Sequence, residues 1–354
     1  MSFAFRLRQA LLIARLELGR AFFSRRAFWV YGLALFPLLI FVGHGIDVTL
    51  KQKRWAASAI TREQLERVAE GQTLEEVAQQ LGKPIRQGHW EDRDEKRTHD
   101  WRSYYDGSRR VDMDFTNGLL TQIRKHGLVD FDEDRTVLAT VFQYFYLRLA
   151  IFFGCLGIFM NLFRGEMLDK TLHYWLLAPA RRETLLVGKY LAGVTASAVI
   201  FGIGTAACFY GVMWYQNPAE TTAYWAGPGP AHLFWYLAAS ALACLGYGSV
   251  FLAAGLLVRN PIVPAAVLLI WESINGFLPA ALQKLSVLYY VQSLCPVPPV
   301  DFDSDTPALI KMLLSPAEPA SAAMAVMGVL GVTGLVLWAA GRAIRRTEIN
   351  YGTE

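Results

Sequence analysis

Residues 137–163 read VLATVFQYFYLRLAIFFGCLGIFMNLF, and the polar stretch RGEMLDKTLHYWLLAPARRETLLVGK follows at 164–189. The first stretch is long enough to cross a bilayer, because a helix of about 20 apolar residues spans about 30 Å of hydrocarbon. A second apolar run begins at Leu185, so the polar stretch lies between two predicted spans. The sequence therefore predicts a helical membrane protein with a short polar connection between two of its spans.

The composition agrees with several spans and one soluble insertion. Of the 354 residues, 54% are hydrophobic and only 18% are charged, which is less charge than a soluble chain usually carries. The charge is concentrated in residues 49–135, which hold 16 Lys or Arg and 17 Asp or Glu, 33 of the 64 charged residues. We expect a soluble domain at 49–135, and no nucleic-acid partner.

Apolar runs predict six transmembrane helices, at residues 27–46, 137–163, 185–215, 232–258, 262–282 and 320–341. Lys and Arg gather before the first run, in the connection that follows residue 163, and after the last run, whereas residues 216–230 contain neither. The positive-inside rule then places both termini in the cytoplasm and the soluble domain outside, since large domains cross largely regardless of their charge.

The expected organisation is an α-helical polytopic membrane protein with a small α+β extracytoplasmic domain inserted after the first helix. Its predicted parts are a basic amphipathic cytoplasmic helix at 1–26, transmembrane helix 1 at 27–48, the extracytoplasmic α+β domain at 49–135, transmembrane helices 2–6 within 136–346 with a cytoplasmic coupling segment at 164–184, and a cytoplasmic tail at 347–354.

The N-terminal segment reads as a basic helix at the cytoplasmic membrane surface. Leu7, Leu11, Ala14, Leu18 and Phe22 fall on one side of such a helix, with arginines at the border. A solvated basic flank of the first span is the alternative. A cleaved signal peptide is disfavoured, because the apolar run has no small-residue cleavage site at its end.

The soluble domain has two helix starts followed by strands. Thr61 with Gln64, and Thr73 with Glu76, each fit a capping box. Gly82 is expected to end the second helix. Residues 110–115 then alternate between polar and apolar between an Asp-Gly turn at 106–107 and an Asn-Gly turn at 117–118, which predicts an antiparallel meander.

This order of elements resembles the small periplasmic domains of the BamE-like (SmpA/OmlA) family over about residues 60–125. The residues that carry the resemblance are Gly71, Gln72, Thr73, Glu76, Val77, Leu81, Gly82, Lys83, Pro84, Trp101 and Tyr104. The resemblance implies a protein-binding domain, so that an envelope protein is an expected partner there, and it implies no catalysis.

Motifs for enzyme chemistry are missing from the chain. Lys170-Thr171 has the spacing of a P-loop end, but Asp169 stands where glycine is needed and would repel phosphate. The cysteines have neither metal-ligand nor redox spacing. We expect no catalytic residues, no metal and no cofactor in this chain.

Two charged residues fall within predicted spans at similar depth. Because a charge facing lipid is costly, Arg148 and Glu272 are expected to pair inside the bundle or to line a translocation path. The remaining interpretation is that the span boundaries are misplaced.

The polar connection resembles that of the membrane subunits of type-two ABC (ATP-binding cassette) transporters. The motif comprises an acidic residue at the end of the second span, a Thr-Leu helix, a Leu-x-x-Pro stop, a basic pair and Gly-Lys at the start of the third span. Here these are Glu166, Thr171-Leu172, Leu176 to Pro179, Arg181-Arg182 and Gly188-Lys189. The basic N-terminal helix and the predicted six spans extend the resemblance over nearly the whole chain outside the inserted domain.

The resemblance implies an ABC permease subunit, an exporter of the bacterial inner membrane. It would act as a homodimer or heterodimer in membrane lipid, with a separate ATPase subunit that binds ATP and Mg. The residues that the resemblance assigns to ATPase coupling are Glu166, Thr171, Leu172, Trp175, Leu176, Arg181 and Arg182. Leu168, Leu172, Trp175 and Leu176 also form an apolar stripe at helical spacing, which an ATPase groove or the lipid headgroups could receive.

Two other classes of function stay open. One is a membrane-anchored envelope assembly or receptor protein that acts through its outer domain. The other is a membrane enzyme that uses Glu272 as acid or base, although no second matched titratable group is apparent on a nearby span.

Overall fold

The computed structural model describes residues 3–23, 27–92, 97–107, 109–168, 175, 181–258, 262–275, 278, 280–299 and 319–346. The chain forms two compact units. The helical unit comprises residues 1–40, 135–211 and 222–354, and the sheet unit comprises residues 41–134 and 212–221.

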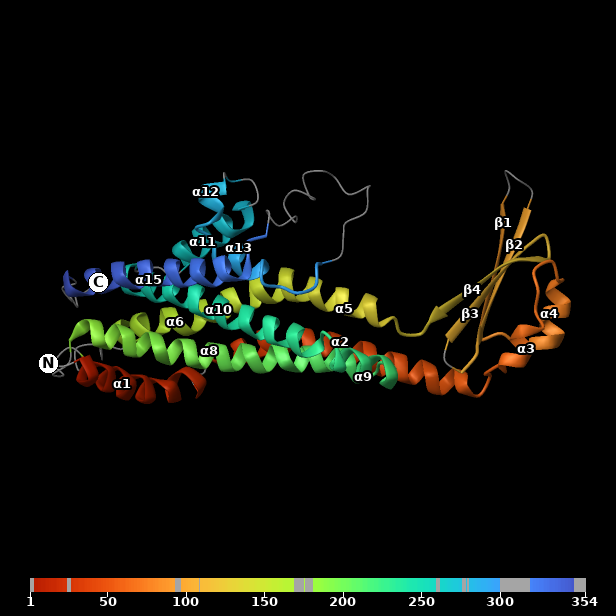
Figure 1. Ribbon diagram of the computed structural model, residues 1–354, viewed down its shortest axis with the longest axis horizontal. Coiled ribbons are helices and arrows are strands. Elements are labelled where there is room, and N and C mark those ends of the chain that lie inside the picture. The colour runs from red at the N-terminus through yellow and green to blue at the C-terminus, as the bar shows by residue number, and fades with distance from the viewer. Residues whose placement is uncertain are drawn as a thin grey trace. The chain divides into compact units, whose positions relative to one another are not determined.

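Long helices make up most of the helical unit (Figure 1). In chain order the helices outside the sheet region are α1 (Phe3–Phe23), α2 (Ala27–Ala56), α5 (Phe131–Thr140), the π-helix η1 (Val141–Ala150), α6 (Ile151–Leu168), α8 (Arg182–Met213), α9 (Pro218–Ala226), α10 (Gly229–Leu257), α11 (Ile262–Ile274), α12 (Ala280–Gln283), α13 (Val287–Gln292) and α15 (Ala322–Arg346).

Within the described part of the chain, five helices are long and apolar enough to cross a membrane. They are Phe28–Ala56, Phe131–Phe163, Arg182–Met213, Gly229–Leu257 and Ala322–Arg345. The chain thus has the helices of a multi-pass membrane protein, and the first of them extends beyond the predicted end at residue 48.

The predicted continuous fifth span at 262–282 is not formed. The apolar helix α11 ends at Ile274 after 13 residues, which is only about 20 Å of helix. The sequence has Asn-Gly at 275–276 and proline at 279, and these residues disfavour an uninterrupted helix. Hydropathy alone missed this break because the residues around it remain apolar.

Helix α10 lies beside α6 and α15 in the centre of the helical unit. Phe152 on α6 packs edge-on against Tyr247 and Phe251 on α10, with ring centroids 5.4 and 5.0 Å apart. Gly255 brings the two helices close, since a Cβ there would lie 3.1 Å from the backbone of Met160. The second predicted span therefore packs closely against α10, in addition to being apolar enough to cross a membrane.

A ten-residue π-helix interrupts that second span at Val141–Ala150. π-helices are rare and usually limited to one turn. The Tyr146 hydroxyl, within this segment, donates a hydrogen bond to the Phe201 carbonyl of α8 at 2.8 Å. Gly204 makes room for it, because a Cβ at this position would lie 2.2 Å from the same hydroxyl.

The sheet unit contains α3 (Arg62–Glu66), α4 (Leu74–Leu81) and strands β1 (Arg86–Asp92), β2 (Arg97–Tyr105), β3 (Arg109–Thr116) and β4 (Leu119–Gly127). The strands form an antiparallel sheet in the order β1-β2-β3-β4. Both predicted capping boxes are present, at Thr61 and Thr73, and Gly82 ends α4 with a φ of 77°. Asn117 and Gly118 have φ of 52° and 78°, as a tight hairpin turn requires.

Helices α3 and α4 pack on one face of the sheet (Figure 1). The core between them consists of Ile60, Leu65, Val68, Val77, Leu81, Tyr104, Val111, Met113, Phe115 and Leu120. The predicted alternation along β3 is confirmed, because its apolar side chains are fully buried while those between them are partly exposed. Most charged side chains of the strands, together with Trp90, His99 and Trp101, line the opposite face.

Candidate functional site

A buried ionic cluster lies near the start of α8. Lys189 is completely buried, and its Nζ lies 2.9 Å from Oε1 of Glu17 and 2.8 Å from Oε1 of Glu166. Both carboxylates are also buried. A buried charge is tolerated only when it is well paired, so these contacts bind α1, the end of α6 and the start of α8 to one another.

Trp175 and Arg20 complete the cluster. The indole Nε1 of Trp175 donates a hydrogen bond to Oε1 of Glu166 at 3.0 Å, and Arg20 lies 3.2 Å from the same oxygen. The Lys189 ammonium is also 5.3 Å from the ring centroid of Trp175 and 5.5 Å from that of Phe163, within the range of a cation–π interaction. The predicted coupling residues Glu166 and Trp175 are therefore in direct contact.

Burial has the largest effect on the pKa of Glu166. It raises the pKa of the Glu166 carboxyl above its ordinary value, and the nearby Lys189 ammonium opposes that rise. The formal charges of Glu17, Glu166, Arg20 and Lys189 cancel. The loss of one charged member would therefore leave a net charge in a buried place.

Helix α1 packs on α8 through small side chains. Its buried residues Ala10, Ile13, Ala14 and Glu17 fall on one stripe, and a Cβ on Gly188 would lie 2.7 Å from Cβ of Ile13. Of the residues expected on the membrane side, Leu7 and Leu11 are exposed, Leu18 and Phe22 are partly exposed, and Ala14 is buried, contrary to the prediction. Helix α1 thus has a narrow buried stripe against the protein and a leucine-rich surface away from it.

A second set of contacts joins the start of α8 to the end of α15. Arg182 donates a hydrogen bond to the Ile344 carbonyl at 3.2 Å, and Glu183 forms an ion pair with Arg345. Arg181, the other half of the predicted basic pair, is exposed. Among the described residues, Arg182 is the member of this pair that contacts α15.

The remaining predicted coupling residues, Thr171, Leu172 and Leu176, lie outside the described residues. Sequence reasoning did not single out Glu17, although it is the only acidic residue among the first 46 and a lone acid in a basic helix is a usable signal. Lys189 was recognised as part of a motif, while its burial and its two carboxylate partners were not foreseen.

The predicted pair of Arg148 and Glu272 does not form a direct ion pair in the described part of the chain. Glu272 is buried on α11 and accepts hydrogen bonds from the Ser286 hydroxyl and, at 3.2 Å, from the backbone N–H of Val287. Arg148 instead lies over the ring of Tyr144, 5.7 Å from its centroid. Glu272 therefore fixes the start of α13, which the depth argument could not anticipate.

Groups of three or more His, Cys, Asp or Glu placed to hold a metal ion do not occur in the residues that the structure describes. No protein-family model matches the chain, and no curated protein matches it either. The fold by itself defines the class, a helical protein of multi-pass type that carries a small four-stranded antiparallel sheet.

Proposed function

We propose that the chain is the permease subunit of an ATP-driven ABC transporter of the bacterial inner membrane, an exporter with both termini in the cytoplasm. It forms the translocation path as a homodimer or heterodimer and couples to a separate ATPase subunit that binds ATP and Mg. The observation that carries the proposal is the contact of Trp175 and Glu166 with the buried Lys189.

The cluster supports coupling because it joins a single tryptophan of the polar connection to three helices at once. A displacement of Trp175 would move Glu166, to which it is hydrogen-bonded, at the end of α6. Through Lys189 it would also move α8 and Glu17 of α1. Paired charges that are buried move together, since separating them exposes each to an uncompensated desolvation cost. An ATPase that closes on the connection would thus displace two spans and the N-terminal helix as one body.

We further propose that α11 and α13 together make the crossing that one helix was expected to make. Glu272 near the end of α11 is bonded to Ser286 and Val287 at the start of α13. Further along, the carbonyl of Val297 accepts a hydrogen bond at 3.1 Å from Gln143, near the first turns of the second span. Two short helices joined by a buried acid can carry the chain across where neighbouring helices satisfy the break.

Co-purification tests the coupling proposal. A chain carrying both Leu172→Asp and Trp175→Asp, extracted from its native membrane in mild detergent, should lose the ATP hydrolysis that accompanies the unaltered chain. Leu119→Asp is the control, because Leu119 is an exposed leucine of β4, and it should retain that activity. Equal ATP hydrolysis by the double variant and the control would refute the proposal.

The alternative is an envelope assembly or receptor protein. One observation favours it: α3 and α4 cover only one face of the four-stranded sheet, which leaves the other face accessible to a partner. Under this alternative ATP hydrolysis would be absent from every preparation, including the unaltered chain. The same experiment therefore distinguishes the two functions.

A further inference from the structure

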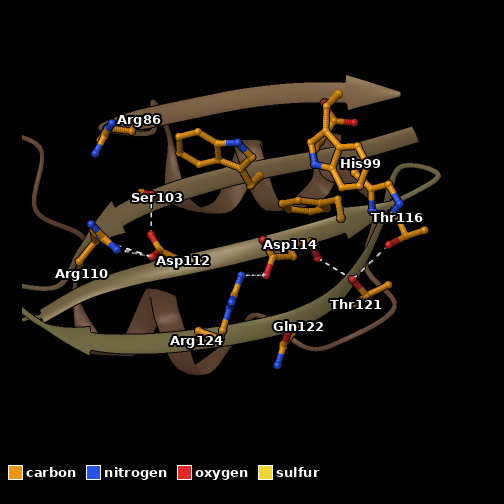
Figure 2. Close-up of a pocket in the computed structure, with 14 residues that line it drawn as sticks. Arg86, His99, Ser103, Arg110, Asp112, Asp114, Thr116, Thr121, Gln122 and Arg124 are labelled. Atoms are coloured by element: carbon orange, nitrogen blue, oxygen red, sulfur yellow. Dashed lines mark hydrogen bonds and ion pairs between the residues drawn. The ribbon is translucent and has the colours of Figure 1, made fainter. Parts of the chain in front are cut away.

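The face of the sheet that carries no helices holds a groove of about 620 Å³. Its walls are side chains of all four strands, and Figure 2 shows them converging from one side of the sheet. The volume is in the range of small-molecule sites. Because all of its lining belongs to one sheet, the groove does not depend on any other part of the chain.

Two aromatic surfaces form one end of the groove. The rings of Trp90 and His99 stack at 4.2 Å with an interplanar angle of 10°, and Trp90 remains 53% exposed. The indole of Trp101 packs closely against Gly88 of β1, since a Cβ on Gly88 would be 2.4 Å from its Nε1. Flat aromatic faces that stay exposed on a rigid sheet provide apolar contact area with little loss of side-chain freedom on binding.

Two of the three aspartates in the groove are paired with arginines of the groove. Asp112 accepts a hydrogen bond from Ser103 at 2.5 Å and lies 2.8 Å from a guanidinium nitrogen of Arg110. Asp114 is paired with Arg124. The ionisable lining consists of three arginines and three aspartates, besides His99. An ionic ligand that used these four residues would have to break the two pairs, whereas a neutral ligand meets them as fixed donors and acceptors.

We infer that this groove binds a neutral saccharide. A sugar ring has an apolar C–H face that fits the exposed ring of Trp90 and the partly exposed ring of Trp101, and hydroxyl groups that both donate and accept hydrogen bonds. The paired carboxylates and guanidiniums offer complementary atoms in fixed positions, and Gln122 and Thr121 add neutral ones at the rim. A peptide that extends the sheet would bind the edge of a strand instead of this face.

Calorimetric titration of the full-length chain in lipid nanodiscs tests the inference. The probes are maltohexaose, cellohexaose and chitohexaose, of which at least one should bind with a Kd between about 10 μM and 1 mM. Trp90→Ala should weaken that binding at least about tenfold, and Trp90→Phe should restore part of it, because the aromatic face rather than the indole N–H makes the contact.

Arg62→Ala is the matched control, since Arg62 is exposed on α3, the helix on the other face of the sheet. It should bind the saccharide as the unaltered chain does. No heat from any of the three probes at about 10 mM would overturn the inference. Unchanged affinity of Trp90→Ala would overturn it too, as would a Trp90-dependent association with a protein in place of a saccharide. None of these results bears on ATPase coupling, which uses other residues.

Discussion

Lys189 is a fully buried ammonium with two carboxylate partners, Glu17 and Glu166, at hydrogen-bonding distance. Taking such a charge out of water costs several kcal/mol, which its partners only offset. The contacts of Lys189 with Glu17 and Glu166 therefore fix the positions of α1, α6 and α8 more than they stabilise the fold. Arg20 belongs to the same cluster, but its side chain is 67% exposed, so solvent screens its contribution.

This difference predicts unequal effects within one cluster. Lys189→Met should lower the free energy of unfolding by about 3–5 kcal/mol, because two buried carboxylates lose their main partner. Arg20→Gln should cost at most about 1 kcal/mol. Denaturant unfolding in detergent measures both. Equal losses for the two variants would mean that burial of Lys189 does not govern the cluster.

At this scale the sequence could identify residues but not their partners. Glu166 and Trp175 stood out because they lie in a short ordered motif, and their contact follows from nearness along the chain. The distance in sequence between Glu17 and Lys189 gave no reason to pair them. Arg148 and Glu272 were matched by depth alone, and depth does not determine which side of a helix a residue occupies.

Among the elements, α1 shows most directly how small residues control packing. Gly188 on α8 faces Ile13 and the carbonyl of Ala10, and a Cβ there would be 2.7 Å from the side chain and 2.9 Å from the carbonyl oxygen. A carbonyl cannot move without moving the helix. Gly19, on α1 itself, has no atom within 4 Å of a Cβ added to it.

The same substitution at the two glycines should thus have opposite effects. Gly188→Ala should destabilise the chain by about 1–3 kcal/mol, since α1 must shift away from α8. Gly19→Ala should stabilise it by up to about 1 kcal/mol, because alanine favours a helix and meets no obstacle. Thermal unfolding in detergent compares them. A stabilising Gly188→Ala would show that α1 does not pack on α8 in this way.

Elements specified by local chemistry were predictable, and those that depend on packing were not. The capping boxes at Thr61 and Thr73 and the Asn-Gly turn at 117–118 act within a few residues, so the sequence contains their cause. The π-helix in the second span includes Tyr146, whose hydroxyl bonds to α8, a contact distant in sequence. No local pattern in its residues differs from that of an ordinary apolar helix.

For the whole molecule, hydropathy identified the membrane-protein class and the apolar runs, but it overestimated the number of unbroken helices. Each of the five long helices overlaps a predicted run. The fifth run, at residues 262–282, contains a break that hydropathy does not detect, because hydropathy reports apolar composition and not whether the backbone stays helical. The sheet unit was separable from the sequence because charge and period-two alternation coincide there.

The central claim, that residues 164–184 contact an ATPase, is tested most directly by photo-crosslinking in the native membrane. A benzophenone amino acid replaces Leu172 in one chain and Arg62, exposed on α3, in a second. We predict that irradiation joins the chain altered at 172 to a protein that is itself labelled by an azido-ATP analogue, and that the chain altered at 62 forms no such product. If neither position yields an ATP-labelled product, or both do equally, the claim is contradicted.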